Sequence, residues 1–264
     1  MIKELLKKGF SSLGYEVRRK VEPGWGYDLS AEAVAAAGRV APYTMLSMER
    51  LITLYQQVAH CEKIGLQGAF VECGVWKGGG VGMMALANLK HGKARRDIHL
   101  FDAFDDICEP DRAVDGAGAA REASLFSPGG QAQGRLQPLK GFYDHRGGHG
   151  TVEGNRDLLE RQLGYDPARL HFHKGWFQDT LPTDAKAVGP IALLRLDGDW
   201  HASTMVCLEH LYDLVVPGGF VVIDDYGCYE GCKKAVDEFR SRRKIDNFLN
   251  HIDETGRYWI KSGR

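Results

Sequence analysis

The chain lacks an excess of charge of either sign, and it lacks long apolar runs. Its 34 lysines and arginines nearly balance 35 aspartates and glutamates, so the formal net charge is −1. Nucleic-acid-binding chains usually carry a basic patch, so we expect no nucleic-acid partner. No run approaches the roughly 18–20 apolar residues that span a bilayer. The start, M-I-K-E-L-L-K-K-G-F, has no apolar core of a secretory signal. These absences predict a cytoplasmic protein without a membrane partner.

Cysteine motifs are also missing. The six cysteines include no C-x-x-C pair, and Cys228 and Cys232 have no second pair to complete a zinc site. We therefore expect reduced thiols, as is usual in the cytoplasm, and no structural zinc. Cys73 lies inside an apolar run and is most simply a small core residue.

The length and composition suit one large α/β domain with appendages, since 44% of the 264 residues are hydrophobic. We expect an N-terminal helical extension at 1–42 and the main domain at 43–264. The apolar residues of the extension that lie near helical spacing are Leu5, Leu6, Phe10 and Leu13. A helix docked on its own domain or on a partner subunit is favoured over a membrane-surface helix. Its apolar face favours a homo-oligomer.

The order of the patterned segments predicts a parallel sheet. Apolar runs of strand length lie at 68–73, 98–101, 170–173, 191–196 and 219–223. Segments of helical character lie at 47–65, 78–89, 152–163, 203–214 and 231–242. Strands that alternate with helices predict an α/β fold with a mostly parallel sheet covered on both faces. The tail D-E-T-G-R-Y-W-I-K predicts a last antiparallel strand at 257–261. His171 and His173 share one strand face and are expected to be a packed or surface pair.

Two segments depart from this alternation. Residues 21–43 contain several glycines and prolines and predict an irregular connection. Residues 105–150 have few large apolar residues and many glycines, and a loop of this length in a compact domain usually has a function. We interpret the second segment as a lid or insertion over the site, with a short helix near 119–126. Asp144, His145 and His149 of this segment could suggest a second metal site, but solvated loop residues are the simpler interpretation.

Two of the apolar runs end in a pair of acids. The run L-L-R-L-D-G-D-W places Asp197 and Asp199 after one strand, and P-G-G-F-V-V-I-D-D-Y places Asp224 and Asp225 after the next. Carboxylates there are costly to desolvate, and parallel strands end at one edge of a sheet. A hard cation explains them best, with Asp197, Asp224 and Asp225 as ligands and open positions for a substrate. No histidine or cysteine stands beside these acids in the motif, which favours magnesium over zinc.

A glycine-rich turn lies earlier in the chain. The stretch E-C-G-V-W-K-G-G-G begins at Glu72, and its glycines at 74 and 78 let the backbone pass close to a ligand. The spacing is not G-x-G-x-x-G, so the dinucleotide fingerprint is not met. Asp102 ends the next strand, where it could accept the ribose hydroxyls of an adenosine-type ligand or cap a helix. Its position about one βαβ unit after the turn favours the ribose.

Together, six motifs resemble those of the macrocin O-methyltransferase (TylF-type) family. They are Y-T-M-L at 43–46, V-E-C-G-V-W-K-G-G at 71–79, L-F-D-A-F at 100–104, K-G-W-F-Q-D-T-L-P at 174–182, L-D-G-D at 196–199 and P-G-G-F-V-V-I-D-D-Y at 217–226. The resemblance covers about 43–261. It implies a class I, S-adenosylmethionine-dependent and metal-dependent enzyme that methylates sugar hydroxyls of glycosylated natural products such as antibiotics. It also implies a Rossmann-like, mostly parallel seven-stranded sheet with an antiparallel last strand.

The resemblance also implies roles for individual residues. Those implied to contact S-adenosylmethionine are Thr44 and Met45 at its methionine end, Glu72, Cys73, Gly74, Val75 and Trp76 at the glycine turn, Asp102, Ala103 and Phe104 at the ribose, Trp176 and Phe177 at the adenine, and Asp197. Asp197, Asp224 and Asp225 are implied to bind the metal, with Asp199 as the general base. Some relatives have a histidine directly after this acid. Here Trp200 stands there, which leaves Asp199 a better candidate than His201.

The expected chemistry suits these residue types. A divalent ion that chelates two neighbouring hydroxyls of a small-molecule glycoside or sugar lowers the pKa of the hydroxyl that reacts. A carboxylate can take its proton while the methyl group is held in line. Two alternatives stay open, namely methylation of a catechol or phenolic diol and a noncatalytic adenosyl-ligand binding protein. Asp199 argues against the second, because simple binding gives no reason for a fourth acid.

Overall fold

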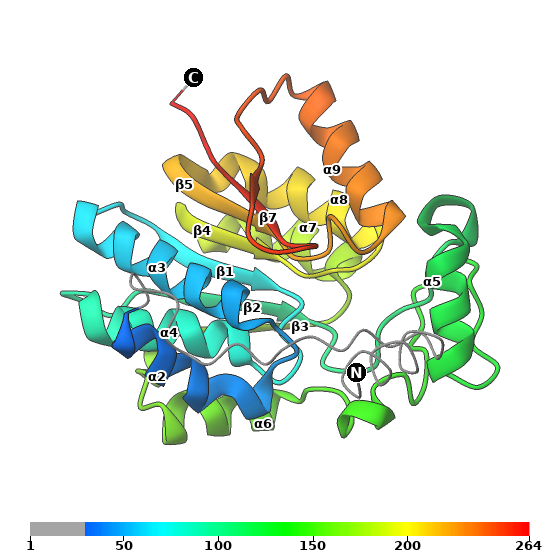
Figure 1. Cartoon of the computed structure of the whole chain (residues 1–264), viewed down its shortest axis with the longest axis horizontal. Coiled ribbons are helices and arrows are strands. Elements are labelled where there is room, and N and C mark those ends of the chain that lie inside the picture. The colour runs from blue at the N-terminus through cyan, green and yellow to red at the C-terminus, as the bar shows by residue number, and fades with distance from the viewer. Residues whose placement is uncertain (1–29, 264) are drawn as a thin grey trace, which may run out of the picture. The chain divides into compact units, whose positions relative to one another are not determined.

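A seven-stranded sheet forms the centre of the fold in this computed structural model, which describes residues 30–263. The strand order is β3-β2-β1-β4-β5-β7-β6, and β7 runs antiparallel to its neighbours β5 and β6 (Figure 1). The strands are β1 Ala69–Cys73, β2 Ile98–Asp102, β3 Leu170–Lys174, β4 Ile191–Leu196, β5 Val215–Ile223, β6 Asn250–His251 and β7 Arg257–Ile260. The predicted Rossmann-like sheet, mostly parallel with an antiparallel last strand, is confirmed.

Helices cover both faces of the sheet. They are α2 Ala31–Val40, α3 Met48–Ile64, α4 Gly79–His91, α5 Arg112–Phe126, α6 Val152–Arg156 with a π-helical continuation at Asp157–Gln162, α7 Phe177–Val188, α8 His201–Leu211 and α9 Glu230–Arg242. One layer holds α2, α3, α4 and α6, and the other holds α7, α8 and α9 (Figure 1). In β1, Phe70 packs into the first core and Val71 into the second, both with no exposed surface. Both faces of the strand are therefore buried, which is why it reads as a continuous apolar run.

Two helices were not expected. Residues 31–40 form α2 rather than part of an irregular connection, because A-E-A-V-A-A-A-G-R-V is rich in alanine, the strongest helix former. Its buried residues Ala33, Ala36, Ala37 and Val40 recur at the helical spacing. Helix α7 follows the glycine at 175, and it buries Leu181, Ala185 and Val188 at the same spacing despite Pro182. Tertiary packing of a narrow apolar stripe stabilises both helices.

The apolar residues of the expected N-terminal helix, Leu5, Leu6, Phe10 and Leu13, lie outside the described residues, so that helix and the homo-oligomer it suggests stay predictions. No helix among residues 30–263 is both long and apolar enough to cross a membrane.

The segment 105–150 has more structure than a loop. Helix α5 is longer than expected and bends at Gly116, where φ is 85°. Two isolated β-bridges, Cys108 with Pro138 and Asp111 with Gln133, pair the chain before this helix with the chain after it. A small core of Ala123, Leu139 and Phe142 lies beneath it. Figure 1 shows α5 beside the carboxyl ends of β1 to β3, where it also packs against α9.

Three histidines stack across β2 and β3. The His99 ring lies 4.5 Å from the ring of His171, and its Nδ1 lies 3.1 Å from Nε2 of His173. These rings are packed on the sheet, as expected for a histidine pair on β3, and none lines the main cavity. Burial, together with His171 and His173, lowers the pKa of His99 from 6.5 to about 4, while Asp97 opposes the shift. His99 is therefore neutral near pH 7.

This buried histidine makes stability depend on pH. The unfolded chain takes up a proton on His99 near pH 6.5, whereas the folded chain resists it until about pH 4. The contribution of His99 is fully present above pH 6.5 and is lost as the pH falls toward 4, by up to about 3 kcal/mol. In urea unfolding, His99→Phe, which keeps a stacking ring, is expected to flatten this dependence. The exposed His251→Gln control should not, and equal slopes for the two variants would contradict the prediction.

Candidate active site

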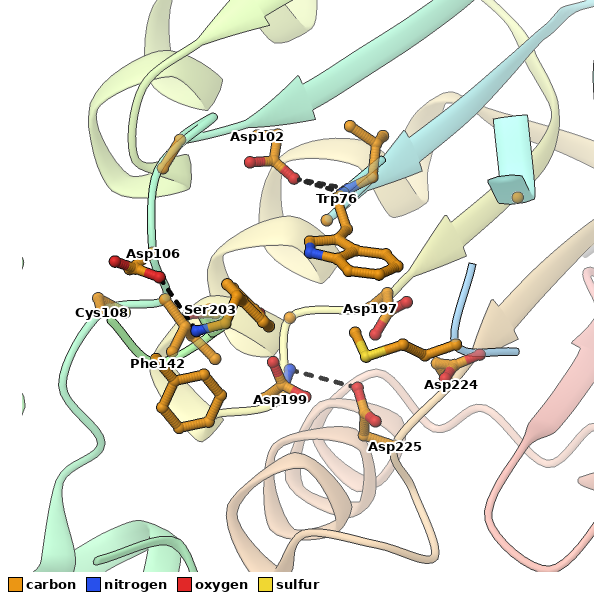
Figure 2. A pocket seen from close by; sticks show the side chains of 18 of the residues that line it. Trp76, Asp102, Asp106, Cys108, Phe142, Asp197, Asp199, Ser203, Asp224 and Asp225 are labelled. Atoms are coloured by element: carbon orange, nitrogen blue, oxygen red, sulfur yellow. Dashed lines mark hydrogen bonds between the residues drawn. The ribbon is translucent and has the colours of Figure 1, made fainter. Parts of the chain in front are cut away.

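A cavity of about 410 Å³ opens at the carboxyl ends of the central strands. Its walls come from the residues that follow β1, β2, β4 and β5, from the segment before α3, and from the 105–150 segment. Figure 2 shows Trp76 next to Asp102 on one side of the cavity. The other side holds the acids Asp197, Asp199, Asp224 and Asp225. Ligands in open α/β sheets bind in this position, so the cavity is the candidate active site.

Backbone strain is concentrated at the same strand ends. Among the described residues that are not glycine, four have positive φ, and three of them follow the central strands. These are Trp76 after β1 (φ 46°), Phe104 after β2 (φ 50°) and Asp199 after β4 (φ 57°). L-residues adopt this conformation at a cost of order 1–3 kcal/mol, and such residues cluster at functional sites. The strain therefore supports placing the site at this edge.

Gly74 lets the turn after β1 approach the end of β4. Its φ is 86°, and a Cβ atom there would lie 1.8 Å from the carbonyl oxygen of Asp197. The Asp197 N–H donates to the carbonyl of Cys73 at 2.8 Å, which extends the pairing of the two strands beyond their ends. The glycine turn thus holds Asp197 at the boundary between the turn and the acids.

Asp102 braces the glycine turn from β2. Its Oδ2 accepts the backbone N–H groups of Val75 at 2.7 Å and Trp76 at 3.0 Å, and its Oδ1 accepts that of Phe104 at 2.6 Å (Figure 2). Burial raises the pKa of Asp102, and these three hydrogen bonds oppose the shift. No helix begins until Arg112, so Asp102 is not a helix cap. It lines the cavity, where its Oδ1 keeps a lone-pair site for one further hydrogen bond.

Three of the four predicted acids converge. One carboxylate oxygen from each of Asp197, Asp199 and Asp225 lies within 4.8 Å of the others, and the Asp199 N–H donates to Oδ2 of Asp225 at 3.3 Å (Figure 2). Burial raises the pKa of Asp199 and of Asp225 well above the usual range, and the neighbouring carboxylates raise it further. A cation would relieve both effects. Magnesium binds oxygens at about 2.1 Å, so its ligand atoms lie about 3–4 Å apart, which this cluster can provide.

Asp224 has a different environment from the other three acids. Its two carboxylate oxygens form ion pairs with Arg195 and Arg50. Arg195 is a functional residue that was not predicted, although the sequence carries a signal for it. An arginine inside the buried run L-L-R-L must have acidic partners, because an unpaired buried charge is prohibitively costly. Besides Asp224, Arg195 also forms ion pairs with Asp197 and Glu72, which are two further acids of the cavity.

Most residues that the resemblance assigns to the cofactor line the cavity. They are Thr44, Met45, Glu72, Gly74, Val75, Trp76, Asp102, Ala103, Trp176, Phe177 and Asp197. Cys73 and Phe104 do not, because their side chains are buried in the two cores. His201 lies outside the acid cluster and pairs with Glu238 at 2.8 Å.

The 105–150 segment forms one wall of the cavity. The sequence predicted a lid or insertion here but not which of its residues line the cavity. It contributes Asp105, Asp106, Ile107, Cys108, Glu122, Phe126, Phe142, Tyr143, His145 and Arg146. The His145 ring stacks on Phe126 at 4.1 Å instead of joining a metal site. His149 lies near Asp105 and Asp106. Asp106 already accepts two backbone N–H groups, those of residues 141 and 143, so its carboxylate has a structural role in the segment.

Three hydrogen bonds fasten this segment to the loops that carry the acids. The Trp200 indole N–H donates to the carbonyl of Cys108 at 2.9 Å. The backbone N–H of His201, at the start of α8, donates to Asp115 at 2.8 Å. The Tyr229 hydroxyl, at the start of α9, donates to Glu122 at 2.9 Å. The cavity wall and the acid-bearing loops are therefore held together.

Comparisons with known proteins identify the family of the chain. A protein-family profile described as Macrocin-O-methyltransferase (TylF) matches residues 20–125 and 155–261. The chain is 33% identical over 217 residues (82% of this chain, 75% of the relative) to an 8-demethyl-8-(2,3-dimethoxy-alpha-L-rhamnosyl)-tetracenomycin-C 4'-O-methyltransferase of Streptomyces olivaceus. It is also 33% identical over 234 residues (88% of this chain, 81% of the relative) to a demethyldecarbamoylnovobiocin O-methyltransferase of Streptomyces niveus.

A solved structure is similar over most of the chain. The O-methyltransferase NovP superposes with a TM-score of 0.67 at 31% identity, covering 83% of this chain and 82% of that one. The calicheamicin methyltransferase CalS11 superposes with a TM-score of 0.55 at 17% identity, covering 91% of this chain and 99% of that one, and supports the fold alone. The family match leaves out residues 126–154, which supply Phe126, Phe142 and Tyr143 to the cavity.

The contact between Gly74 and Asp197 can be tested by adding one methyl group. Gly74→Ala is expected to lower the free energy of unfolding by about 3 kcal/mol, because the Cβ would collide with backbone and the φ is unfavourable for alanine. Gly118→Ala is the matched control. Gly118 lies inside α5 with no atom within 4 Å of an added Cβ, so alanine should stabilise the protein by up to about 1 kcal/mol. Equal urea midpoints for the two variants would contradict the packing described.

Proposed function

Since the chain belongs to the macrocin O-methyltransferase (TylF) family and is an S-adenosylmethionine-dependent O-methyltransferase, we propose that it methylates a sugar hydroxyl of a glycosylated natural product. The observation that carries the proposal is the acid cluster Asp197, Asp199 and Asp225, which lies in one cavity with the glycine turn. Two relatives support the acceptor class by name, a rhamnosyl-tetracenomycin 4'-O-methyltransferase and the mycinamicin III 3''-O-methyltransferase of Micromonospora griseorubida. Enzymatic relatives leave no support for the noncatalytic alternative.

The proposed donor site is the half of the cavity nearest the glycine turn. Asp102 accepts a ribose hydroxyl of S-adenosylmethionine at the lone-pair site of Oδ1 that the turn leaves free. Trp176 and Phe177, at the start of α7, face the adenine, and Thr44 and Met45 lie at the methionine end. These residues orient the methyl group toward the acids, and the closed cavity wall keeps bulk water from competing with the acceptor.

The proposed ligands of a magnesium ion are Asp197, Asp224 and Asp225. The raised pKa values of the neighbouring acids, caused by burial and by mutual repulsion, show negative charge that the chain neutralises only in part. An ion bound there would acidify a hydroxyl of a chelated diol. Asp199 then accepts the hydroxyl proton, the oxygen forms a bond to the methyl carbon, and the bond from that carbon to sulfur breaks. Asp199 is the proposed base because its carboxylate lies beside Asp197 and Asp225 in the cavity, where the chelated hydroxyl would lie.

Product formation tests the acceptor class. The purified protein should convert S-adenosylmethionine and a glycoside with two neighbouring hydroxyls into S-adenosylhomocysteine and a product one methyl group heavier by mass spectrometry, over many turnovers. The matched deoxy-glycoside, which lacks the neighbouring hydroxyl, should react far more slowly, and EDTA should stop the reaction until Mg²⁺ is returned. Turnover with catechol but with no glycoside would replace the sugar acceptor by a phenolic one. Equal rates before and after EDTA would remove the metal from the proposal.

A pair of matched variants separates the proposed ligands from the proposed base. Asp199→Asn is expected to lower kcat by about 10²–10⁴-fold, because the proton acceptor is lost, while Mg²⁺ and S-adenosylhomocysteine still bind in isothermal titration. Asp224→Asn is expected to weaken Mg²⁺ binding by at least about tenfold. The exposed Asp213→Asn, which lies outside the cavity, is the control. If Asp199→Asn abolished Mg²⁺ binding and Asp224→Asn preserved it, the three converging acids would be the ligands instead.

A further inference from the structure

A single buried guanidinium connects the two halves of the cavity. Arg195 lies on β4 with 2% of its surface exposed. Its Nη1 forms an ion pair with Glu72, on β1 at the glycine turn. Its Nη2 contacts Oδ2 of Asp197 at 3.0 Å and also pairs with Asp224, the acid that ends β5. One rigid, planar group thus bridges a carboxylate on the donor side and two carboxylates on the metal side.

Glu72 depends on this contact. Its side chain is 1% exposed and lines the cavity, and its Oε2 has no hydrogen-bond partner among the described residues. Arg195 is the one cation of the described chain that forms an ion pair with it. The carboxylate also fills the space of a missing side chain, since a Cβ on Gly80 in the first turn of α4 would lie 2.4 Å from its Oε1. Its orientation is therefore set from two sides, by the helix start and by Arg195.

The acids proposed to bind the metal depend less on Arg195 than Glu72 does. Asp224 is also held by Arg50 of α3, whose Nε pairs with Asp253 at 2.8 Å. Asp197 and Asp224 end the neighbouring strands β4 and β5 (Figure 2), so both reach Nη2. An ion that draws on these two acids competes with Nη2 and leaves Nη1 with Glu72 as the main contact of the guanidinium.

We propose that Arg195 is a positioning residue that couples donor binding to metal binding, by orienting Glu72 on one side and Asp197 with Asp224 on the other. This inference rests on the proposed metal site. The coupling is reciprocal, so each ligand changes the affinity for the other by the same factor. Occupancy of the metal side tightens the contact between Arg195 and Glu72 and so strengthens donor binding.

Isothermal titration of the full-length protein tests this without turnover. In the wild type, saturating Mg²⁺ is expected to tighten S-adenosylhomocysteine binding by about fivefold or more, and saturating S-adenosylhomocysteine should tighten Mg²⁺ binding equally. Arg195→Lys keeps one charge but loses the planar fork, so the coupling should disappear. Glu72→Gln should remove the coupling while Mg²⁺ binding alone stays at the wild-type affinity, which general damage to the structure would not produce. Arg242→Lys, at an exposed pair with Glu209, is the control and should keep the coupling.

The outcomes separate this inference from the proposed function. A wild type that binds both ligands without coupling, or a Glu72→Gln variant that keeps the coupling, overturns the role of Arg195 and leaves the metal site intact. A wild type that binds S-adenosylhomocysteine but no Mg²⁺ overturns both. If circular dichroism shows that Arg195→Lys does not fold, Glu72→Gln decides alone, because it leaves Arg195 with its two aspartate partners.

Discussion

The site is organised around buried negative charge that the chain's own cations neutralise only in part. Glu72, Asp197, Asp199, Asp224 and Asp225 end or follow three neighbouring strands, and Arg195 and Arg50 pair with only some of them. Carboxylates this close and this buried are unfavourable without a counter-charge. The strands bring them together nevertheless, because β1, β4 and β5 are adjacent and parallel. Packing of the two cores offsets the electrostatic cost, and the remaining negative charge favours the proposed cation.

The glycine turn and the cavity wall extend this arrangement to the donor and the acceptor. Asp102 holds the turn by its backbone, and Gly74 lets that turn reach Asp197. On the other side, Asp115 and Glu122 of α5 bind residues that follow the acid pairs. Both ligand sites are thus built against the same two loops. The residues at 126–154, which lie outside the family match, supply Phe126, Phe142 and Tyr143 to this wall.

The sheet and the acids could be predicted from the sequence because their signals are local. An apolar run such as A-F-V-E-C at 69–73 identifies a buried strand, and a pair of acids after such a run identifies a strand end at a site. The contacts of Asp224 could not be predicted, because Arg50 and Arg195 reach it from segments distant in sequence. Helix α2 was missed because its alanines lie among glycines and prolines. The small core around Phe142 was missed because its few apolar residues are spread over 105–150.

The positive φ of Asp199 sets stability against activity at this position. Glycine there would relieve both the backbone strain and the repulsion from Asp197 and Asp224. Selection for thermal tolerance alone would therefore favour loss of this carboxylate, and with it the group proposed to take the proton. Laboratory evolution of more robust forms of this enzyme needs a simultaneous screen for turnover, since a stabilising change at Asp199 lies where the chemistry is proposed to occur.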